Sequence, residues 1–302
     1  MEIKISTPRQ FNFIRTVFSH GWCELVPFEL NKKRSRLIRV VELADGSPVT
    51  LTISRAGHGV KIDAPGRVNR AAAAKIERDV RHMLRLNDDM TGFYSAVASN
   101  AEFEWVAREG AGRLLRAPTV FEDLVKMICT TNCSWALTDK MNAALVNLLG
   151  KSSADGRRSF PTARAMAEMP AGFYRDEVRA GYRAPYLKEL ADSVASGVVD
   201  PEQWLSSELP AAELKREMKK IRGVGDYAAE NMMRLVGRYD GLALDSWIRS
   251  KFSKTRNAGR KASDKKIERY YSGFGEWKGL ALWCDMTRDW LDDERGTRNE
   301  ER

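Results

Sequence analysis

The stretch that most constrains how this chain can fold runs from residue 213 to residue 252, ELKREMKKIRGVGDYAAENMMRLVGRYDGLALDSWIRSKF. Apolar residues recur at helical spacing on both sides of the break Gly223-Val224-Gly225. After a second break at residues 237–241, Asp245 stands just before another helical pattern. The pattern therefore predicts a helix, a glycine hairpin, a second helix, and a lone acid at the start of a third helix.

The hairpin is a candidate phosphate site. Glycines permit positive φ and close backbone approach, and the N–H groups that follow Gly225 point out of a helix N-terminus, which suits a phosphate. Basic residues surround it, namely Lys215, Arg216, Lys219, Lys220 and Arg222. A tight turn between two helices that binds nothing is the alternative. The glycines also fit a loose dinucleotide fingerprint, but that motif follows a strand, and the preceding segment here has a helical pattern.

The first 84 residues predict an antiparallel sheet with a helix. Residues 11–17 and 60–62 have strand patterns, and residues 37–43 and 49–53 flank Asp45-Gly46, a strong hairpin signal. Asn69 can cap a helix that extends to about Leu86. The predicted fold class is α+β, with an N-terminal antiparallel sheet domain over residues 1–84 that is followed by a mostly helical core over 85–290 and a frayed tail over 291–302.

Helical patterns fill the predicted core. They begin near Met90, Pro118, Asn142, Pro161, Gly181, Ile267 and Trp277, and a polar loop covers residues 151–160. Between Lys251 and Arg269, inclusive, there are eight basic residues and two acidic ones. This basic segment is either a second phosphate contact or a solvated loop.

Composition points to a polyanionic partner. The net charge is +9 and the isoelectric point is about 9.4. The start, MEIKISTPRQ, does not read as a signal peptide, no apolar run is long enough to span a bilayer, and the four scattered cysteines do not suggest a disulfide framework. We expect a monomer with no membrane partner, in the cytoplasm (in the nucleoid if the source is bacterial).

The segments IRGVGDYAAENMMRL and LALDSWIR resemble the helix-hairpin-helix and aspartate signature of the HhH-GPD superfamily of base-excision DNA glycosylases. The resemblance implies that a hairpin at residues 221–227, with Gly223, Val224 and Gly225, holds a phosphate of double-stranded DNA. It also implies a structural monovalent cation at the carbonyls of Ile221 and Val224. Asp245 would be the catalytic acid that faces the sugar. Arg222 stands where the family usually has proline.

Two further segments carry the resemblance. Residues 117–135, APTVFEDLVKMICTTNCSW, are similar to the segment that holds the gap-filling residue, which makes Asn132 the candidate plug for the space that a flipped base leaves. Residues 274–283 resemble the closing helix, as Gly181-Tyr-Arg-Ala184 resembles an element before the hairpin. The resemblance puts Trp247 and Trp283 in the base pocket. The alternative for Asn132 is a helix–helix hydrogen bond or a loop cap, and for both tryptophans it is ordinary core packing.

The resemblance is greatest to the alkylpurine (3-methyladenine DNA glycosylase II) and 8-oxoguanine branches. Bifunctional members carry a Schiff-base lysine two residues after the second hairpin glycine, where this chain has Tyr227. We therefore expect a monofunctional enzyme, with Tyr227 in the hairpin and the base pocket, that acts on alkylated purines. Only Cys284 lies where iron–sulfur members have four cysteines, so no cluster or other cofactor is expected. The alternatives are an 8-oxoguanine-type glycosylase and a non-catalytic helix-hairpin-helix DNA-binding protein.

Overall fold

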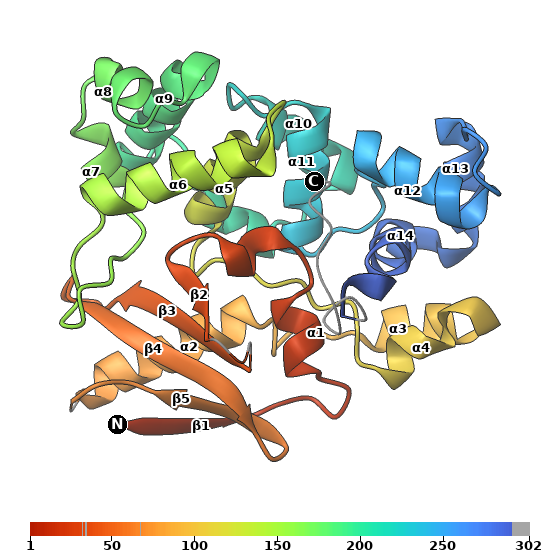
Figure 1. The fold of residues 1–302 in the computed structure, drawn as a ribbon, viewed down its shortest axis with the longest axis horizontal. Helices are drawn as coiled ribbons and strands as arrows, with labels where there is room; N and C mark the ends of the chain where they lie inside the picture. Colours follow the sequence, from red (N-terminus) through yellow and green to blue (C-terminus); the bar gives the residue numbers. More distant parts are fainter. Residues whose placement is uncertain (32, 34, 67, 292–302) are drawn as a thin grey trace.

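The computed structural model describes residues 1–31, 33, 35–66 and 68–291, so the predicted tail falls outside the described residues except for Leu291. An N-terminal sheet lies on one side and a larger body of helices lies over it (Figure 1). In the described residues the sheet has five antiparallel strands in the order β1-β5-β4-β3-β2. The strands are β1 (Glu2–Ser6), β2 (Phe28–Leu30), β3 (Arg36–Glu42), β4 (Pro48–Ala56) and β5 (Gly59–Asp63).

The predicted hairpin is confirmed as β3 and β4. Leu37 pairs with Ile53 and Val41 with Val49. In the turn, Gly46 has φ +78°, and Asp45 Oδ1 accepts a hydrogen bond from the Ser47 amide at 2.9 Å. Asp-Gly supplies the positive φ that such a turn requires, which is why the sequence signal was reliable here.

The predicted strand at residues 11–17 is wrong. Phe13–Val17 is a short helix, α1, and the Asn12 side chain accepts a hydrogen bond from the Arg15 amide at 3.1 Å as its N-cap. Phe13, Thr16 and Val17 are buried, at the spacing of one helix face. A run of large apolar residues this short fits either structure, and the cap decided between them.

The helical body carries the remaining elements. The α-helices are α2 (Arg70–Met83), α3 (Thr91–Ala98), α4 (Glu104–Arg108), α5 (Val120–Thr130), α6 (Trp135–Leu149), α7 (Ala163–Ala167), α8 (Ala171–Asp176), α9 (Ala184–Ala195), α10 (Ala211–Lys219), α11 (Asp226–Val236), α12 (Ser246–Arg256), α13 (Asp264–Tyr271) and α14 (Lys278–Met286). The 3₁₀ turns are η1 (Gly21–Glu24), η2 (Ala101–Phe103), η3 (Gly181–Arg183), η4 (Pro201–Ser206), η5 (Ser272–Trp277) and η6 (Arg288–Leu291).

Side-chain caps set several helix boundaries. Asn69 caps α2 as predicted, through the Ala72 amide at 2.8 Å. Helix α6 begins at Trp135, seven residues before the predicted start at Asn142, because the Ser134 hydroxyl accepts from the Leu137 amide. At the N-terminus of α5, both carboxylate oxygens of Glu202 accept backbone hydrogen bonds at 3.0 Å, from Val120 and Phe121. An acid placed there satisfies amides that have no partner within the helix.

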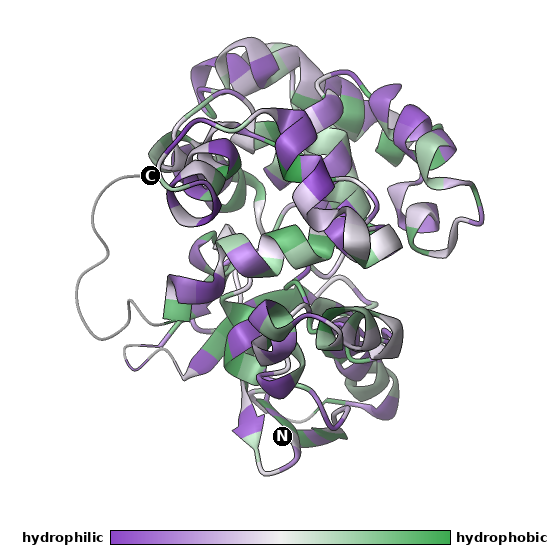
Figure 2. Cartoon of the chain, turned by 90° about the vertical axis from the view of Figure 1, so that its right-hand side faces the viewer, coloured by the Kyte–Doolittle hydropathy of each residue, from purple (hydrophilic) through white to green (hydrophobic). Residues whose placement is uncertain are grey.

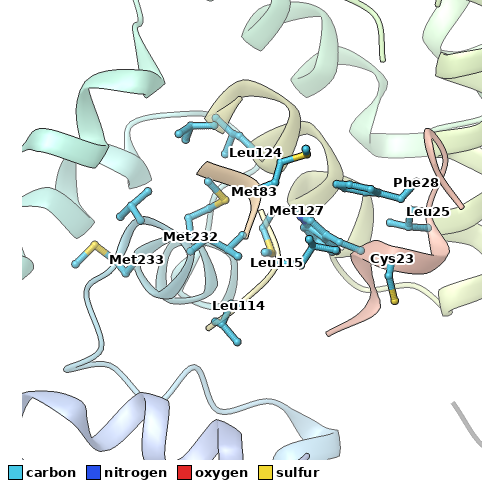
Figure 3. Close-up of a cluster of buried hydrophobic side chains, with 14 of the residues drawn as sticks. Cys23, Leu25, Phe28, Met83, Leu114, Leu115, Leu124, Met127, Met232 and Met233 are labelled. Atoms are coloured by element: carbon cyan, nitrogen blue, oxygen red, sulfur yellow. The ribbon is translucent and has the colours of Figure 1, made fainter. Parts of the chain in front are cut away.

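One hydrophobic core joins the sheet region to the helices. Figure 3 shows part of it, from Leu25 and Phe28 through Leu124 and Met127 of α5 to Met232 of α11. All residues of α5 from Val120 to Cys129 are buried. Hydrophilic residues are frequent on the outer helices in Figure 2, and hydrophobic ones gather where the sheet meets the helices. Among the described residues, no helix has both the length and the apolarity needed to cross a membrane.

Candidate active site

A cavity of about 620 Å³ opens between α1–η1, the α5–α6 turn, the start of α11, the start of α12 and the C-terminal end of α14. Its lining includes every side chain that the sequence predicted for the base pocket and the chemistry: Asn132, Tyr227, Asp245, Trp247 and Trp283. These residues are far apart in the sequence, and the fold brings them to one place.

Helix α11 fixes the loop that carries Asp245. The Glu230 carboxylate accepts a hydrogen bond from the Ala243 amide at 2.6 Å, and Arg234 Nη2 donates to the Leu242 carbonyl at 3.0 Å. On its other side the loop packs against Gly279 of α14, where a Cβ atom would lie 1.9 Å from the Gly241 carbonyl oxygen. The acid is therefore held at a set position relative to the N-terminus of α11.

Asp245 is half-buried and caps α12. Its Oδ1 accepts a hydrogen bond from the Ile248 amide at 2.7 Å. In the part of the chain that the structure describes, its Oδ2 has no hydrogen-bond partner. The carboxylate can thus hold the helix with one oxygen and present the other to the cavity.

The cavity wall is unusually aromatic. In the described residues, five tryptophans line it together with Tyr227 (Trp22, Trp135, Trp247, Trp283 and Trp290). The ring centroids of Trp247 and Trp283 are 6.1 Å apart, and the Trp283 indole nitrogen donates to the Ser19 carbonyl at 2.8 Å. Burial and the negative charge of Asp245 raise the pKa of Tyr227, so its phenol stays neutral at physiological pH.

A buried cation underlies this wall. Arg234 is 2% exposed, and its guanidinium carbon lies 4.8 Å from the Trp283 ring centroid. Burial lowers its pKa to about 10, which still leaves it charged at neutral pH. Arg234 also donates to the Asn231 side chain at 3.2 Å, and Asn231 in turn donates to the Tyr227 carbonyl at 2.9 Å.

Asn132 projects from the α5–α6 turn with φ +47°, a left-handed conformation that asparagine tolerates better than most residues. It is exposed at the rim of the cavity. Exposed Tyr182 lies beside it: the Asn132 amide is 3.4 Å from the Tyr182 hydroxyl, which donates to the Thr131 carbonyl at 3.2 Å. Arg183 bonds the same carbonyl and so braces the turn from below.

The two hairpin glycines differ in what requires them. Gly223 has φ +92°, and a Cβ atom there would lie 2.7 Å from the Tyr186 ring, so the protein itself needs glycine. Gly225 has φ −85° and would place a Cβ in open space, with no atom within 4 Å. Gly225 is the N-cap of α11, where glycine is favoured, and the open space at its Cβ position leaves room for close approach of an external group.

The basic residues near the hairpin are mostly neutralised by neighbours. Lys215 and Lys219 both pair with Asp226, Lys220 pairs with Glu217, and Arg222 lies 3.3 Å from Glu189. The segment 251–269 is different. Six of its cations are exposed and form no ion pair within the described ranges: Lys254, Arg260, Lys261, Lys265, Lys266 and Arg269.

Sequence reasoning missed several residues that line the cavity. His20 and Trp22 come from a segment that carries no motif. Trp135 ends the segment 117–135, and Trp290 lies beyond the predicted closing helix at 274–283, but neither was given a role. Trp135 packs on Gly21, where a Cβ atom would lie 2.4 Å from the indole. Gly21 was the one available sequence signal for this contact, because a glycine lets the Trp135 indole approach the backbone closely. That signal becomes informative only when both segments are seen together.

No protein-family model and no curated protein sequence matches this chain. Solved structures do. The 8-oxoguanine glycosylase/lyase of Clostridium acetobutylicum, bound to DNA, superposes with a TM-score of 0.72 at 20% identity, over 97% of this chain and 98% of that one. The 3-methyladenine DNA glycosylase of Archaeoglobus fulgidus gives a TM-score of 0.74 at 18% identity, over 96% and 99%.

Both structures cover nearly the whole chain, including the N-terminal sheet and the helical body. At these identities the likeness concerns the fold. Their names also match the two branches that the hairpin and aspartate motif resembles. The chain therefore has the fold of the HhH-GPD DNA glycosylases, with an α+β N-terminal region and a helical core.

Proposed function

We propose that this chain is a monofunctional DNA glycosylase of base excision repair. It binds duplex DNA that contains a damaged base, takes the base into the cavity and hydrolyses its N-glycosidic bond. One observation carries the proposal. A single cavity holds Asp245, with one carboxylate oxygen that has no partner among the described residues, against an aromatic wall beside the open hairpin at Gly225.

Each part of this geometry has a task in the reaction. As the bond from C1′ to the base nitrogen breaks, its electron pair leaves with the base and the sugar becomes positively charged. The Asp245 carboxylate stabilises that charge and orients the water whose oxygen bonds to C1′, while the water's proton passes to the base or the solvent. The aromatic wall stacks on the extruded base, and Asn132 fills the space left in the duplex.

The absence of a suitable lysine supports hydrolysis without strand cleavage. None of the described residues that line the cavity is a lysine, and Tyr227 occupies the start of α11. Lys219 and Lys220 lie at the end of α10 in ion pairs with acids. No described amine is therefore placed to form a Schiff base with the sugar.

The hairpin is the proposed phosphate contact. The Ile221 carbonyl accepts one hydrogen bond, from Val224 at 3.0 Å, and a carbonyl oxygen has a second lone pair. The carbonyls of Ile221 and Val224 are thus of a chemistry that fits a monovalent cation. Such an ion would supply positive charge between the hairpin and a phosphate.

The aromatic wall supports an alkylated purine as the substrate, because electron-poor or cationic rings stack well on indole and phenol faces. One observation favours a second candidate, an 8-oxoguanine-type activity. The buried charge of Arg234 against Trp283 disfavours a cationic base and would suit a neutral one.

The experiment is base release from a panel of lesion duplexes, with and without hot alkali. Release of 3-methyladenine or 7-methylguanine, with strand breaks only after alkali, is the expected result. Release confined to 8-oxoguanine would favour the second candidate. Strand breaks without alkali would contradict the monofunctional assignment, and tight binding with no release from any duplex would indicate a non-catalytic DNA-binding protein.

A further inference from the structure

His20 is the cavity residue with the most specific hydrogen-bonding geometry. It precedes η1, between the N-terminal helix α1 and the sheet, and reaches the cavity from that side. Its ring packs edge-on against Trp22, with centroids 4.9 Å apart. Its Nε2 lies 2.6 Å from the Leu115 carbonyl oxygen.

This contact fixes the tautomer. A carbonyl oxygen only accepts hydrogen bonds, so the hydrogen must be on Nε2. Burial lowers the pKa of His20 to about 4, which keeps the ring neutral at physiological pH. In a neutral imidazole whose Nε2 carries the hydrogen, Nδ1 is an acceptor.

His20 lines the cavity, and its acceptor nitrogen is not enclosed by the described protein atoms. No described residue forms a hydrogen bond with Nδ1. This nitrogen is also absent from the set of polar side-chain atoms that the protein encloses completely and leaves without a partner. The histidine therefore has one nitrogen engaged by the protein and one left for a ligand.

The backbone around His20 holds this acceptor in place. The Ser19 hydroxyl accepts from the Leu115 amide at 2.8 Å, and the Ser19 carbonyl accepts from the Trp283 indole at 2.8 Å. His20 is thus tied to the same tryptophan on which a base would stack. These hydrogen bonds fix the position of the His20 backbone relative to Trp283.

We propose that His20 is a specificity-determining residue that reads the edge of the extruded base. Its Nδ1 accepts a hydrogen bond from an N–H donor of that base, and the substrates are therefore damaged bases that carry such a donor. A base that presents only acceptors would set two lone pairs against each other and leave Nδ1 desolvated without a partner. This inference rests on the proposed glycosylase function and narrows its substrate class.

The test compares two kinds of lesion in otherwise identical duplexes. Hypoxanthine, 3-methyladenine and 8-oxoguanine carry N–H donors, whereas 1,N6-ethenoadenine carries none. For wild type we expect kcat/KM to be at least about tenfold higher on an N–H-bearing lesion than on ethenoadenine. Equal or faster release of ethenoadenine would overturn the proposal without any variant.

Two variants separate recognition from folding. His20→Gln places an amide nitrogen where Nε2 donates to Leu115 and removes the Nδ1 acceptor, so the preference in kcat/KM for the N–H-bearing lesion over ethenoadenine should fall roughly tenfold to a hundredfold. His20→Asn places its carbonyl oxygen near the Nδ1 position and should retain much of the preference.

Other outcomes would overturn the proposal in distinguishable ways. If both variants lose activity equally on all lesions, His20 serves only packing. If wild type releases no base at all, the proposed function fails, and this inference fails with it. A duplex with an abasic site has no base for His20 to contact, so wild type and His20→Gln should bind it with the same affinity.

Discussion

Asp245 has two tasks that a single carboxylate can share. One oxygen caps α12 through Ile248, and the other faces the cavity without a described partner. Because the cap needs only an acceptor oxygen, an amide can replace the carboxylate there, whereas stabilisation of a positive sugar needs the charge.

Asp245→Asn should therefore separate the two tasks. We expect base release to fall about a hundredfold to a thousandfold, as for loss of one preorganised electrostatic group, while the helix cap is kept. Affinity for lesion DNA should be kept or increased. Single-turnover excision and binding assays on the same duplex measure both, and unchanged excision would remove Asp245 from the chemistry.

The hairpin glycines give a matched pair of substitutions. In Gly225→Ala the new Cβ contacts no protein atom and the backbone φ is allowed for alanine, so the free energy of unfolding should change by less than about 1 kcal/mol. DNA binding by this variant should weaken equally for all sequences. Gly223→Ala should lower the free energy of unfolding by roughly 1–3 kcal/mol because of its φ and Tyr186. Denaturant melts and titrations with two unrelated duplexes distinguish them; a loss of binding by Gly225→Ala that depends on sequence would contradict a phosphate role.

At the scale of elements, α5 is held to the sheet by a buried ion cluster. Arg39 of β3 bonds both oxygens of Glu122, at 2.9 and 2.6 Å, and Lys126 lies 2.7 Å from the same carboxylate. All three side chains are at most 3% exposed. One anion thus compensates two buried cations at the junction of strand and helix.

Glu122→Gln should be strongly destabilising, because it leaves Arg39 and Lys126 buried without a counter-charge. The expected loss is about 3–5 kcal/mol in the free energy of unfolding. Glu168→Gln, in the exposed pair with Arg164, is the control and should cost under about 1 kcal/mol. Urea unfolding of both variants measures the two losses. A similarly small loss of unfolding free energy in each would mean that the ion cluster adds little to stability.

His82 lies in the last turn of α2, and it should make the free energy of unfolding depend on pH. Burial lowers its pKa to about 4, whereas the unfolded chain binds the proton near its ordinary value of about 6.5. The unfolded state therefore gains a proton first as pH falls, and stability is lost between these two values. Relative to His82→Gln, wild type should lose about 1–2 kcal/mol between pH 7.5 and pH 5; a difference that does not vary with pH would contradict a buried neutral histidine.

At the scale of the whole molecule, residues 254–269 hold a dense run of exposed cations. Near the hairpin, lysines and arginines are paired with acids, but residues 254–269 include six exposed cations without a described ion pair. The segment runs from the last turn of α12 into α13, and the ion pair Arg249–Asp264, at 2.8 Å, ties the start of α13 to the helix that Asp245 caps. We expect a duplex that reaches Asp245 to contact this segment.

DNA binding should weaken steeply with salt, and Lys261→Gln should reduce the slope of log K against log salt by about one. Arg175→Gln is the control, since α8 lies across the molecule from α13 (Figure 1). Fluorescence titrations from low to high salt measure the slopes. Equal slopes in wild type and Lys261→Gln would leave the segment as a solvated loop.

The sequence by itself determined what depends on short-range chemistry. The glycine hairpin and its flanking helices, the Asp45-Gly46 turn and the Asn69 cap are set by backbone freedom and by side chains that bond amides a few residues away. The position of Asp245 at a helix start is of the same kind. Where local signals were weak, as at residues 11–17, prediction failed.

The tertiary structure alone decided which distant residues share the cavity. His20, Trp22 and Trp135 join Trp283 there because the N-terminal segment packs across the helices, and neither spacing nor composition encodes that contact. It also decided which charges are free, since pairing depends on neighbours in space. A helix period or a turn acts within a few residues, whereas a cavity is made by packing between segments hundreds of residues apart.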